Sequence, residues 1–132
     1  MKTCLVLEGG AMRGMYTAGA LDVFYNGGIK FDGIIGVSAG AAFGVNYLSG
    51  QPGRVIRYNK RFNADRHYMG LIPLLKTGNI VDTDYAYDKV PRELDPFDGD
   101  TFDASGVPFW AVVTNVETGR AEDIRLEHAM EQ

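Results

Sequence analysis

The chain has 132 residues, of which 45% are hydrophobic and 23% are charged, a composition typical of one globular domain rather than a disordered or fibrous chain. Its net charge of −4 argues against a protein whose main task is to grip duplex nucleic acid. A lone cysteine, Cys4, excludes an internal disulfide framework and a cysteine-based zinc site within the chain.

The first half of the chain alternates between predicted strands and helices. Residues 4–7, CLVL, are an apolar run typical of a buried parallel strand, in which Cys4 is expected to be a small buried hydrophobe. Apolar residues then recur at helical spacing from Gly14 to the stop at 26–28, Asn-Gly-Gly. Residues 33–37 predict a second buried strand and residues 39–48 a second helix. This order predicts an α/β fold with a parallel sheet.

The middle of the chain is less regular. Residues 54–62 are basic and predict a helix with a solvated face. The apolar stretch 69–75 fits either a lip that faces lipid or a packed loop or core segment, and the packed segment is the simpler interpretation. Residues 83–94 predict a short helix, capped by Thr83 or Asp84 and broken or bounded by Pro91.

The last third predicts a loop and a hairpin. Residues 95–106 are acidic, contain Gly and Pro, and predict a surface loop whose aspartates match a calcium loop too poorly to propose a metal. Residues 107–116 are a strong strand signal, with Trp110 expected in the core, and residues 120–126 are expected to return as the second strand of a hairpin.

The segment Gly36-Val37-Ser38-Ala39-Gly40 fits the pattern G-x-S-x-G between a predicted strand and a predicted helix. A nucleophilic serine at such a sharp turn has a strained backbone, and side chains two residues to either side would collide. The pattern therefore predicts Ser38 as a nucleophile, with Gly36 and Gly40 making the turn. The alternative is a glycine-rich turn with an incidental serine.

A second glycine-rich turn, residues 8–14, EGGAMRG, also follows a strand and precedes a helix. A phosphate-binding P-loop is excluded because no Lys-Ser or Lys-Thr pair follows Gly14. A dinucleotide site would use Gly9 and Gly14 but has Ala11 in the middle, and its candidate acidic residue, Asp32, precedes the strand. The third interpretation of this turn is an oxyanion hole, in which backbone N–H groups stabilise the negative charge that forms on the carbonyl oxygen when Ser38 attacks.

Together the two motifs resemble the N-terminal part of a bacterial patatin-like phospholipase. The family's motif G-G-G-x-[KR]-G is similar to residues 9–14, and its G-x-S-x-G matches residues 36–40. The resemblance, which extends to about Leu126, implies a three-layer α/β fold and a lipid acyl ester hydrolase that needs no cofactor or metal. It implies Ser38 as the nucleophile and an oxyanion loop of five residues: Gly9, Gly10, Ala11, Arg13 and Gly14. Ala11 replaces the family's third glycine, which makes a positive φ costly.

The base that would activate Ser38 is not evident. The resemblance implies an aspartate in a D-G-[GA] motif on a later strand, but Asp32-Gly33 lies on the wrong side of Ser38 and Asp98-Gly99 lies in the acidic loop. His67 and His128 are weak alternatives, since a surface histidine is more often solvated than catalytic.

We therefore expect residues 1–132 to be the N-terminal portion of one such domain, incomplete at its C-terminal side, with little or no esterase activity alone. The alternatives are an inactive fragment or lipid-binding module of the same fold, and a nucleotide-binding α/β module. The partner is expected to be a lipid acyl ester, with no nucleic acid. An unpaired sheet edge invites self-association. The sequence shows neither a signal peptide nor a membrane span, so a cytoplasmic location is expected, and contact with a membrane surface stays open.

Overall fold

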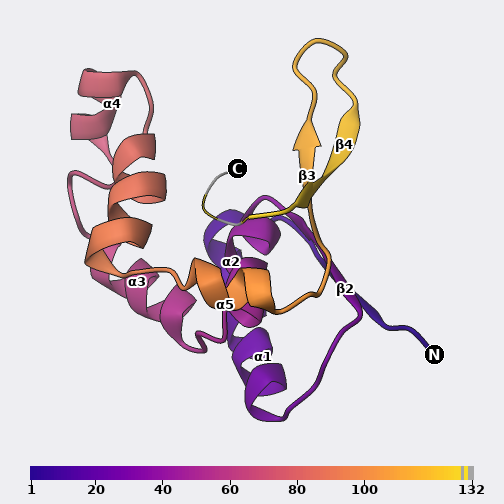
Figure 1. Ribbon diagram of the computed structural model, residues 1–132. Coiled ribbons are helices and arrows are strands. Elements are labelled where there is room, and N and C mark those ends of the chain that lie inside the picture. Colours follow the sequence, from indigo (N-terminus) through magenta and orange to yellow (C-terminus); the bar gives the residue numbers. More distant parts are fainter. Residues whose placement is uncertain (129, 131–132) are drawn as a thin grey trace. The chain divides into compact units, whose positions relative to one another are not determined.

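The structure is a computed structural model that describes residues 1–128 and residue 130. The chain divides into two compact units. Unit 1 comprises Met1–Gly53 and Asp98–Gln132, and unit 2 comprises Arg54–Phe97. Each unit is described by itself (Figure 1).

A four-stranded sheet forms the centre of unit 1. Its strands are β1 (Cys4–Leu7), β2 (Gly33–Val37), β3 (Phe109–Thr114) and β4 (Ala121–Leu126), in the spatial order β1-β2-β3-β4. The first three strands are parallel, whereas β3 and β4 form an antiparallel hairpin. The predicted α/β fold with a parallel sheet is confirmed, and the first two strands have the predicted bounds.

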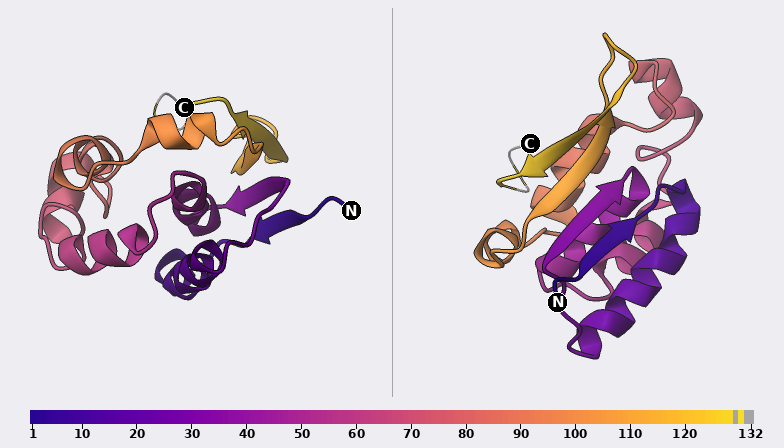
Figure 2. Two further views of the ribbon diagram at one scale, coloured as in Figure 1. Left: turned by 60° about the horizontal axis from the view of Figure 1, so that its bottom comes forward. Right: turned by 90° about the vertical axis from the view of Figure 1, so that its right-hand side faces the viewer.

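The helices of unit 1 are α1 (Gly14–Asn26), α2 (Ala39–Leu48) and the short α5 (Gly99–Ala104), and the 3-10 turn η1 (Ala11–Arg13) precedes α1. Because β1, β2 and β3 follow one another without a reversal, right-handed crossovers place the connecting helices on one face of the sheet. The right-hand view of Figure 2 shows the strands in front of α1 and α2. The predicted bounds of α1 and α2 are confirmed.

The core of unit 1 lies between the sheet and these helices. Leu7, Ile34 and Phe109 come from three neighbouring strands and are fully or almost fully buried. Phe102 of α5 is buried with its ring edge-on to Phe109, the ring centroids being 6.0 Å apart. The expectation of a loop over residues 95–106 was therefore wrong for Gly99–Ala104. Asp98 caps this helix by accepting a hydrogen bond from the Thr101 N–H, and Phe102 anchors it.

The opposite face of the sheet is bare in the described part of unit 1. Cys4 is exposed, so the expectation that it is buried was wrong. Val6, two residues along β1 on the same face, has 67% of its surface exposed, and Val37 of β2 is also exposed. Trp110 of β3 pairs with Ile35 across this face and is half-buried. Parallel strands are normally covered on both faces, so an exposed apolar face is unusual for a parallel sheet.

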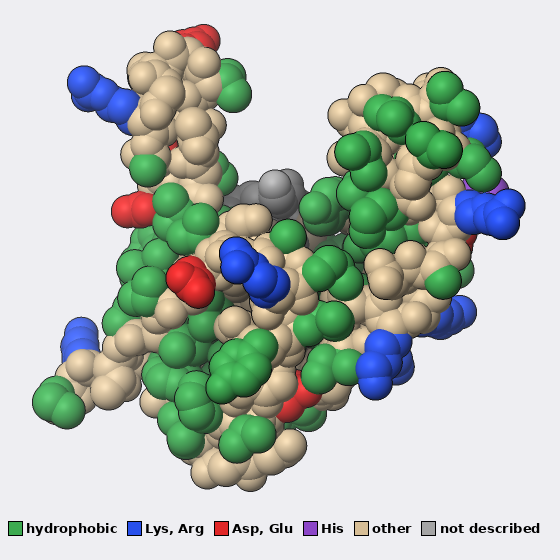
Figure 3. Space-filling view, turned by 180° about the vertical axis from the view of Figure 1, so that it is seen from behind, with side chains coloured by type: hydrophobic (Ala, Val, Ile, Leu, Met, Phe, Trp, Pro, Cys, Tyr) green, Lys and Arg blue, Asp and Glu red, His purple; other side chains and the backbone are tan. Residues whose placement is uncertain are grey.

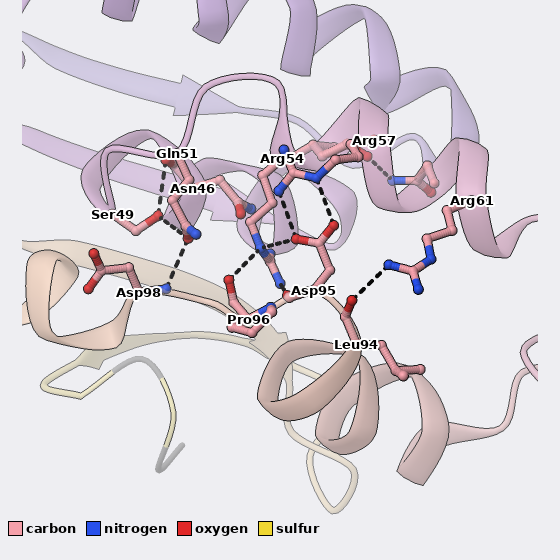
Figure 4. Close-up of polar contacts among 12 residues, drawn as sticks. Asn46, Ser49, Gln51, Arg54, Arg57, Arg61, Leu94, Asp95, Pro96 and Asp98 are labelled. Atoms are coloured by element: carbon pink, nitrogen blue, oxygen red, sulfur yellow. Dashed lines mark hydrogen bonds and ion pairs between the residues drawn. The ribbon is translucent and has the colours of Figure 1, made fainter.

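Unit 2 consists of α3 (Arg54–Phe62), α4 (Leu71–Thr77) and the π-helix η2 (Tyr85–Leu94). A buried ion pair joins its ends (Figure 4). The Asp95 carboxylate accepts hydrogen bonds of 2.9 and 2.8 Å from Arg57, and it lies 3.3 Å from the Nε of the buried Arg54. Burial lowers the pKa of Arg54, and the Asp95 charge acts in the opposite direction. The predicted helix is confirmed. The expectation of a solvated basic face was wrong for Arg54, because the Asp95 carboxylate offsets the cost of burying the guanidinium.

The later part of unit 2 departs from two expectations. Asp82, rather than Thr83 or Asp84, accepts the capping hydrogen bond from the Tyr85 N–H at 3.0 Å. Pro91 lies inside η2, which continues to Leu94. In this wide helix the Asp95 N–H bonds to the carbonyl of Val90, five residues back. Pro91 has no N–H, so the helix lacks one backbone hydrogen bond at that residue.

In the described part of the chain, no helix combines the length and the apolar character needed to cross a membrane.

Candidate active site

Ser38 occupies the sharp corner between β2 and α2. Its backbone has φ 52° and ψ −121°, and the residue is exposed. Positive φ is rare for a residue with a side chain and costs about 1–3 kcal/mol, so it persists only where the surrounding structure enforces it. The corner ends the buried strand β2 and begins α2, so Ser38 stands at the carboxyl end of the parallel strands. This is the conformation that the G-x-S-x-G pattern predicts.

The flanking glycines are required by close backbone contacts. A Cβ at Gly36 would lie 2.5 Å from the Cα of Ala41, inside the first turn of α2. A Cβ at Gly40 would lie 2.4 Å from the carbonyl oxygen of Leu7 and 2.7 Å from that of Glu8. A real Cβ essentially never comes this close to a non-bonded atom, so a side chain at either position would push α2 away from the sheet. The tight corner therefore depends on both glycines.

The second glycine-rich turn lies beside this corner. A Cβ at Gly9 would lie 3.1 Å from the Cβ of Ser38 and 3.4 Å from the Val37 carbonyl oxygen, so the two turns are in contact. Ala11, which replaces the family's third glycine, nevertheless has a positive φ of 46°. The alanine therefore adopts a backbone conformation that a glycine would adopt more easily, at a cost in strain.

The loop is closed by its own backbone. The Arg13 N–H donates a 3.0 Å hydrogen bond to the Gly10 carbonyl, which places Arg13 at the end of η1. Arg13 is exposed to solvent. Gly14 is buried at the start of α1, where a Cβ would lie 2.8 Å from the Phe43 ring of α2. Gly14 thus allows α1 and α2 to approach each other behind the loop.

Several backbone donors face no protein acceptor here. Within residues 1–128 and 130, the N–H groups of Gly10 and Ala11 have no hydrogen-bond acceptor. At the start of α2, the N–H groups of Ala41 and Ala42 donate to the Ser38 carbonyl. The Ala39 N–H precedes them in the first turn, where a helix offers its N–H groups no acceptor of its own. Ala39 was not singled out from the sequence, although any residue that follows a nucleophile at a helix start supplies such a donor.

The topology separates other candidate residues from Ser38. Asp32 precedes β2, and its carboxylate accepts a 2.7 Å hydrogen bond from the Thr3 N–H. It therefore lies at the amino end of the strands, away from the turns, where it is badly placed for a dinucleotide ribose.

His128 follows the end of β4 that pairs with the start of β3, so it also lies at the amino end, where its Nδ1 is 2.8 Å from Asp103. The length of β2, roughly 16 Å at about 3.3 Å per residue, separates that edge from Ser38. His67 lies in unit 2, with its Nδ1 3.2 Å from Asp65. Neither histidine is brought to Ser38 by the contacts within its own unit.

A surface cleft of about 460 Å³ opens at the amino edge of the sheet in unit 1. Its walls include Tyr25, Ile29, Phe31 and Tyr47. The Tyr47 hydroxyl donates to the carbonyl of Ile29, and burial raises the pKa of this hydroxyl, with Tyr25 adding to the effect. The cleft is therefore a feature separate from the Ser38 corner.

Comparison with known proteins agrees with this geometry. A sequence model described as patatin-like phospholipase matches residues 5–127. The chain belongs to the patatin-like phospholipase family. The Ser38 corner and the adjoining loop both fall within the matched region.

Among curated proteins, the chain is similar to the "Uncharacterized protein YjjU" of Escherichia coli (strain K12). It is 32% identical to this chain over 101 residues, which make up 76% of this chain and 28% of that protein. This patatin-like chain thus aligns with little more than a quarter of its relative. No solved structure matched the chain.

Proposed function

We propose that this chain carries the nucleophile and oxyanion loop of a serine acyl hydrolase that acts on lipid acyl esters, of phospholipids or lysophospholipids. The observation that carries the proposal is the exposed Ser38 with φ 52° and ψ −121°, set against Gly9 of the second turn. A strained backbone needs a compensating use, and a projecting hydroxyl beside unpaired amides is suited to acyl transfer.

In this scheme the Ser38 Oγ attacks the acyl carbonyl carbon, and the carbonyl electron pair moves onto the oxygen. In this proposal the N–H groups of Gly10 and Ala11, together with the first amide of α2 at Ala39, donate to that oxygen. One such donor contributes about 3–4 kcal/mol to the stability of the transition state. The ester C–O bond then breaks, the alcohol leaves with a proton, and water splits the acyl-serine to release the fatty acid.

The proton from Ser38 requires a base. The family resemblance implies an aspartate in a D-G-[GA] motif, and no such motif occurs in these 132 residues. We therefore expect the chain alone to react slowly and to turn over esters poorly, because loss of a base leaves only binding and oxyanion stabilisation. A burst of nitrophenol from a short-chain ester, absent in Ser38→Ala, would contradict this expectation and indicate a base within the chain.

Labelling with a fluorophosphonate probe tests the nucleophile directly. The folded chain is expected to acquire one adduct, slowly because no base for Ser38 is evident, and located on Ser38 by peptide mass spectrometry. Ser38→Ala should abolish it, and Ser105→Ala, a serine at the end of α5, should leave it unchanged. The urea-unfolded chain should not label, because the corner and the amides exist only in the fold. Absence of the Ser38 adduct, or equal labelling of the unfolded chain, would favour a lipid-binding module without catalysis.

A further inference from the structure

The segment from Gly70 to Ile80, named here the α4 lobe, projects from unit 2 as a loop that is closed at its base. The Gly70 N–H donates a 2.9 Å hydrogen bond to the Ile80 carbonyl, and the Asp82 N–H donates to the Tyr68 carbonyl at 3.1 Å. A β-bridge between Met69 and Val81 completes this closure. The lobe is thus held by its stem rather than by burial of its tip.

The side chains of the α4 lobe are apolar and exposed. Leu71 has 75% of its surface exposed, Leu75 85% and Ile80 60%. Leu71 and Leu75 are four residues apart on α4, so they share one side of the helix. Pro73, in contrast, is fully buried and anchors the helix. The expectation of a packed loop or core segment over residues 69–75 was therefore wrong, because Pro73 is the one buried residue of α4.

The charges within the lobe have one sign, whereas Asp65 and Asp82 lie at its base. Between Arg66 and Val81 the chain has no acidic residue, and its charged residues are Arg66 and Lys76. The whole of unit 2 has a net charge of +2, whereas the rest of the chain has a net charge of −6. Figure 3 shows hydrophobic side chains gathered over the lobe at the upper right, with basic side chains at its margin.

We propose that the α4 lobe is a docking element for an anionic lipid surface, with the leucines entering the boundary between headgroups and acyl chains and the cations contacting the headgroups. A projecting apolar tip with a basic margin and no acidic residue is complementary to such a surface. A second copy of the chain fits less well, since two-fold pairing of the lobes would bring Arg66 and Lys76 close to their own counterparts. This inference goes beyond the proposed hydrolase activity and does not depend on it.

Co-sedimentation of the full chain with vesicles tests the proposal. The chain is expected to bind vesicles of phosphatidylcholine mixed with phosphatidylserine more tightly than vesicles of phosphatidylcholine alone. Leu71→Ser with Leu75→Ser should lower the partition coefficient about tenfold or more, since both side chains lose apolar contact with lipid. The matched control is Val23→Ser with Val116→Ser, two exposed apolar residues of unit 1, which should bind as the parent chain does.

Lys76→Gln isolates the electrostatic contribution. It should weaken binding to the mixed vesicles about fivefold and leave binding to phosphatidylcholine unchanged. This variant also keeps the proposal testable if the double serine variant is found, from its urea midpoint, to be unfolded. Ser38→Ala should bind vesicles normally, so failure of the hydrolase proposal and failure of the docking proposal are distinguishable.

Three results would overturn the docking proposal. The parent chain could fail to bind the mixed vesicles, or the leucine variant could bind as well as the parent. The leucine variant could also change only the molar mass in light scattering, which would assign the lobe to self-association.

Discussion

Replacement of Gly40 by alanine tests whether the Ser38 corner depends on direct contact between α2 and the end of β1. The new Cβ would lie 2.4 Å from the Leu7 carbonyl oxygen, whereas ordinary carbon–oxygen contacts begin at roughly 3.3 Å. The backbone must therefore open by about 0.9 Å between two elements that have no flexible side chain to yield. Overpacking of a core costs about 1–3 kcal/mol, and a clash with backbone atoms of Leu7 and Glu8 takes the upper end, about 3 kcal/mol. The better helix propensity of alanine offsets about 1 kcal/mol of this. We expect a net loss of about 2 kcal/mol in the free energy of unfolding.

Urea denaturation followed by circular dichroism measures this loss. A change of about 2 kcal/mol moves the urea midpoint down by about 1 M for a chain of this size. Gly19→Ala in α1 is the matched control, because a Cβ there has no neighbour within 4 Å. It should raise the free energy of unfolding by about 0.5–1 kcal/mol through helix propensity alone. Gly40→Ala should also lose the fluorophosphonate adduct, whereas Gly19→Ala should keep it.

A Gly40→Ala chain that is as stable as the parent, or more stable, would refute this reasoning. So would a stable variant that still labels at Ser38 at the parent rate, because the corner would then not require the close approach to the Leu7 carbonyl.

Four other changes have expected outcomes. Ala11→Gly should raise the free energy of unfolding by about 0.5 kcal/mol in urea titrations, since relief of the positive φ exceeds the added chain entropy. Asp95→Asn should destabilise the chain by about 3 kcal/mol in the same assay, because Arg54 remains a buried charge without its carboxylate. The His67 N–H and the Tyr85 hydroxyl hold the pKa of Asp65 below its ordinary value of 3.8, so its contribution is present above that pH and is lost as the pH falls through the lower folded value. Asp65→Asn should therefore flatten the acid limb of the free energy of unfolding against pH. Val6→Lys should reduce self-association in light scattering by placing a charge on the bare sheet face.

Each of these four expectations has a contrary outcome. A loss of stability in Ala11→Gly would mean that the alanine side chain contributes more than its strain costs. Asp88→Asn, which removes an exposed ion pair with Arg92, is the control for Asp95→Asn and should change the free energy of unfolding by less than about 1 kcal/mol. Equal effects of the two substitutions would contradict the role of burial. An unchanged acid limb in Asp65→Asn, or unchanged mass in Val6→Lys, would contradict the remaining two.

Local sequence determined the strands and helices of residues 4–48, their order along the chain, and the position of Ser38 between a strand and a helix. The strands at residues 4–7 and 33–37 and the helices at 14–26 and 39–48 have the predicted bounds, because apolar periodicity and glycine stops act within a few residues. The G-x-S-x-G pattern likewise places Ser38 at a strand-to-helix corner, since the steric conflict that it avoids is local. These are features in which near neighbours in the chain supply most of the interaction energy.

Tertiary structure decided what is buried and what is exposed. Cys4 and Leu7 belong to the same apolar run, yet only Leu7 is covered, because successive crossovers of one hand place the helices on one face of the sheet. Arg54 is buried because the carboxylate of Asp95, which is distant in sequence, lies beside it. Leu75 is exposed although it belongs to an apolar segment, residues 69–75, whose composition is typical of a core. The contact between Gly9 and Ser38 is of the same kind, since strand pairing brings together two turns that are 29 residues apart in the sequence. Burial and long-range contact depend on which elements meet, and that information is not contained in any local stretch of the chain.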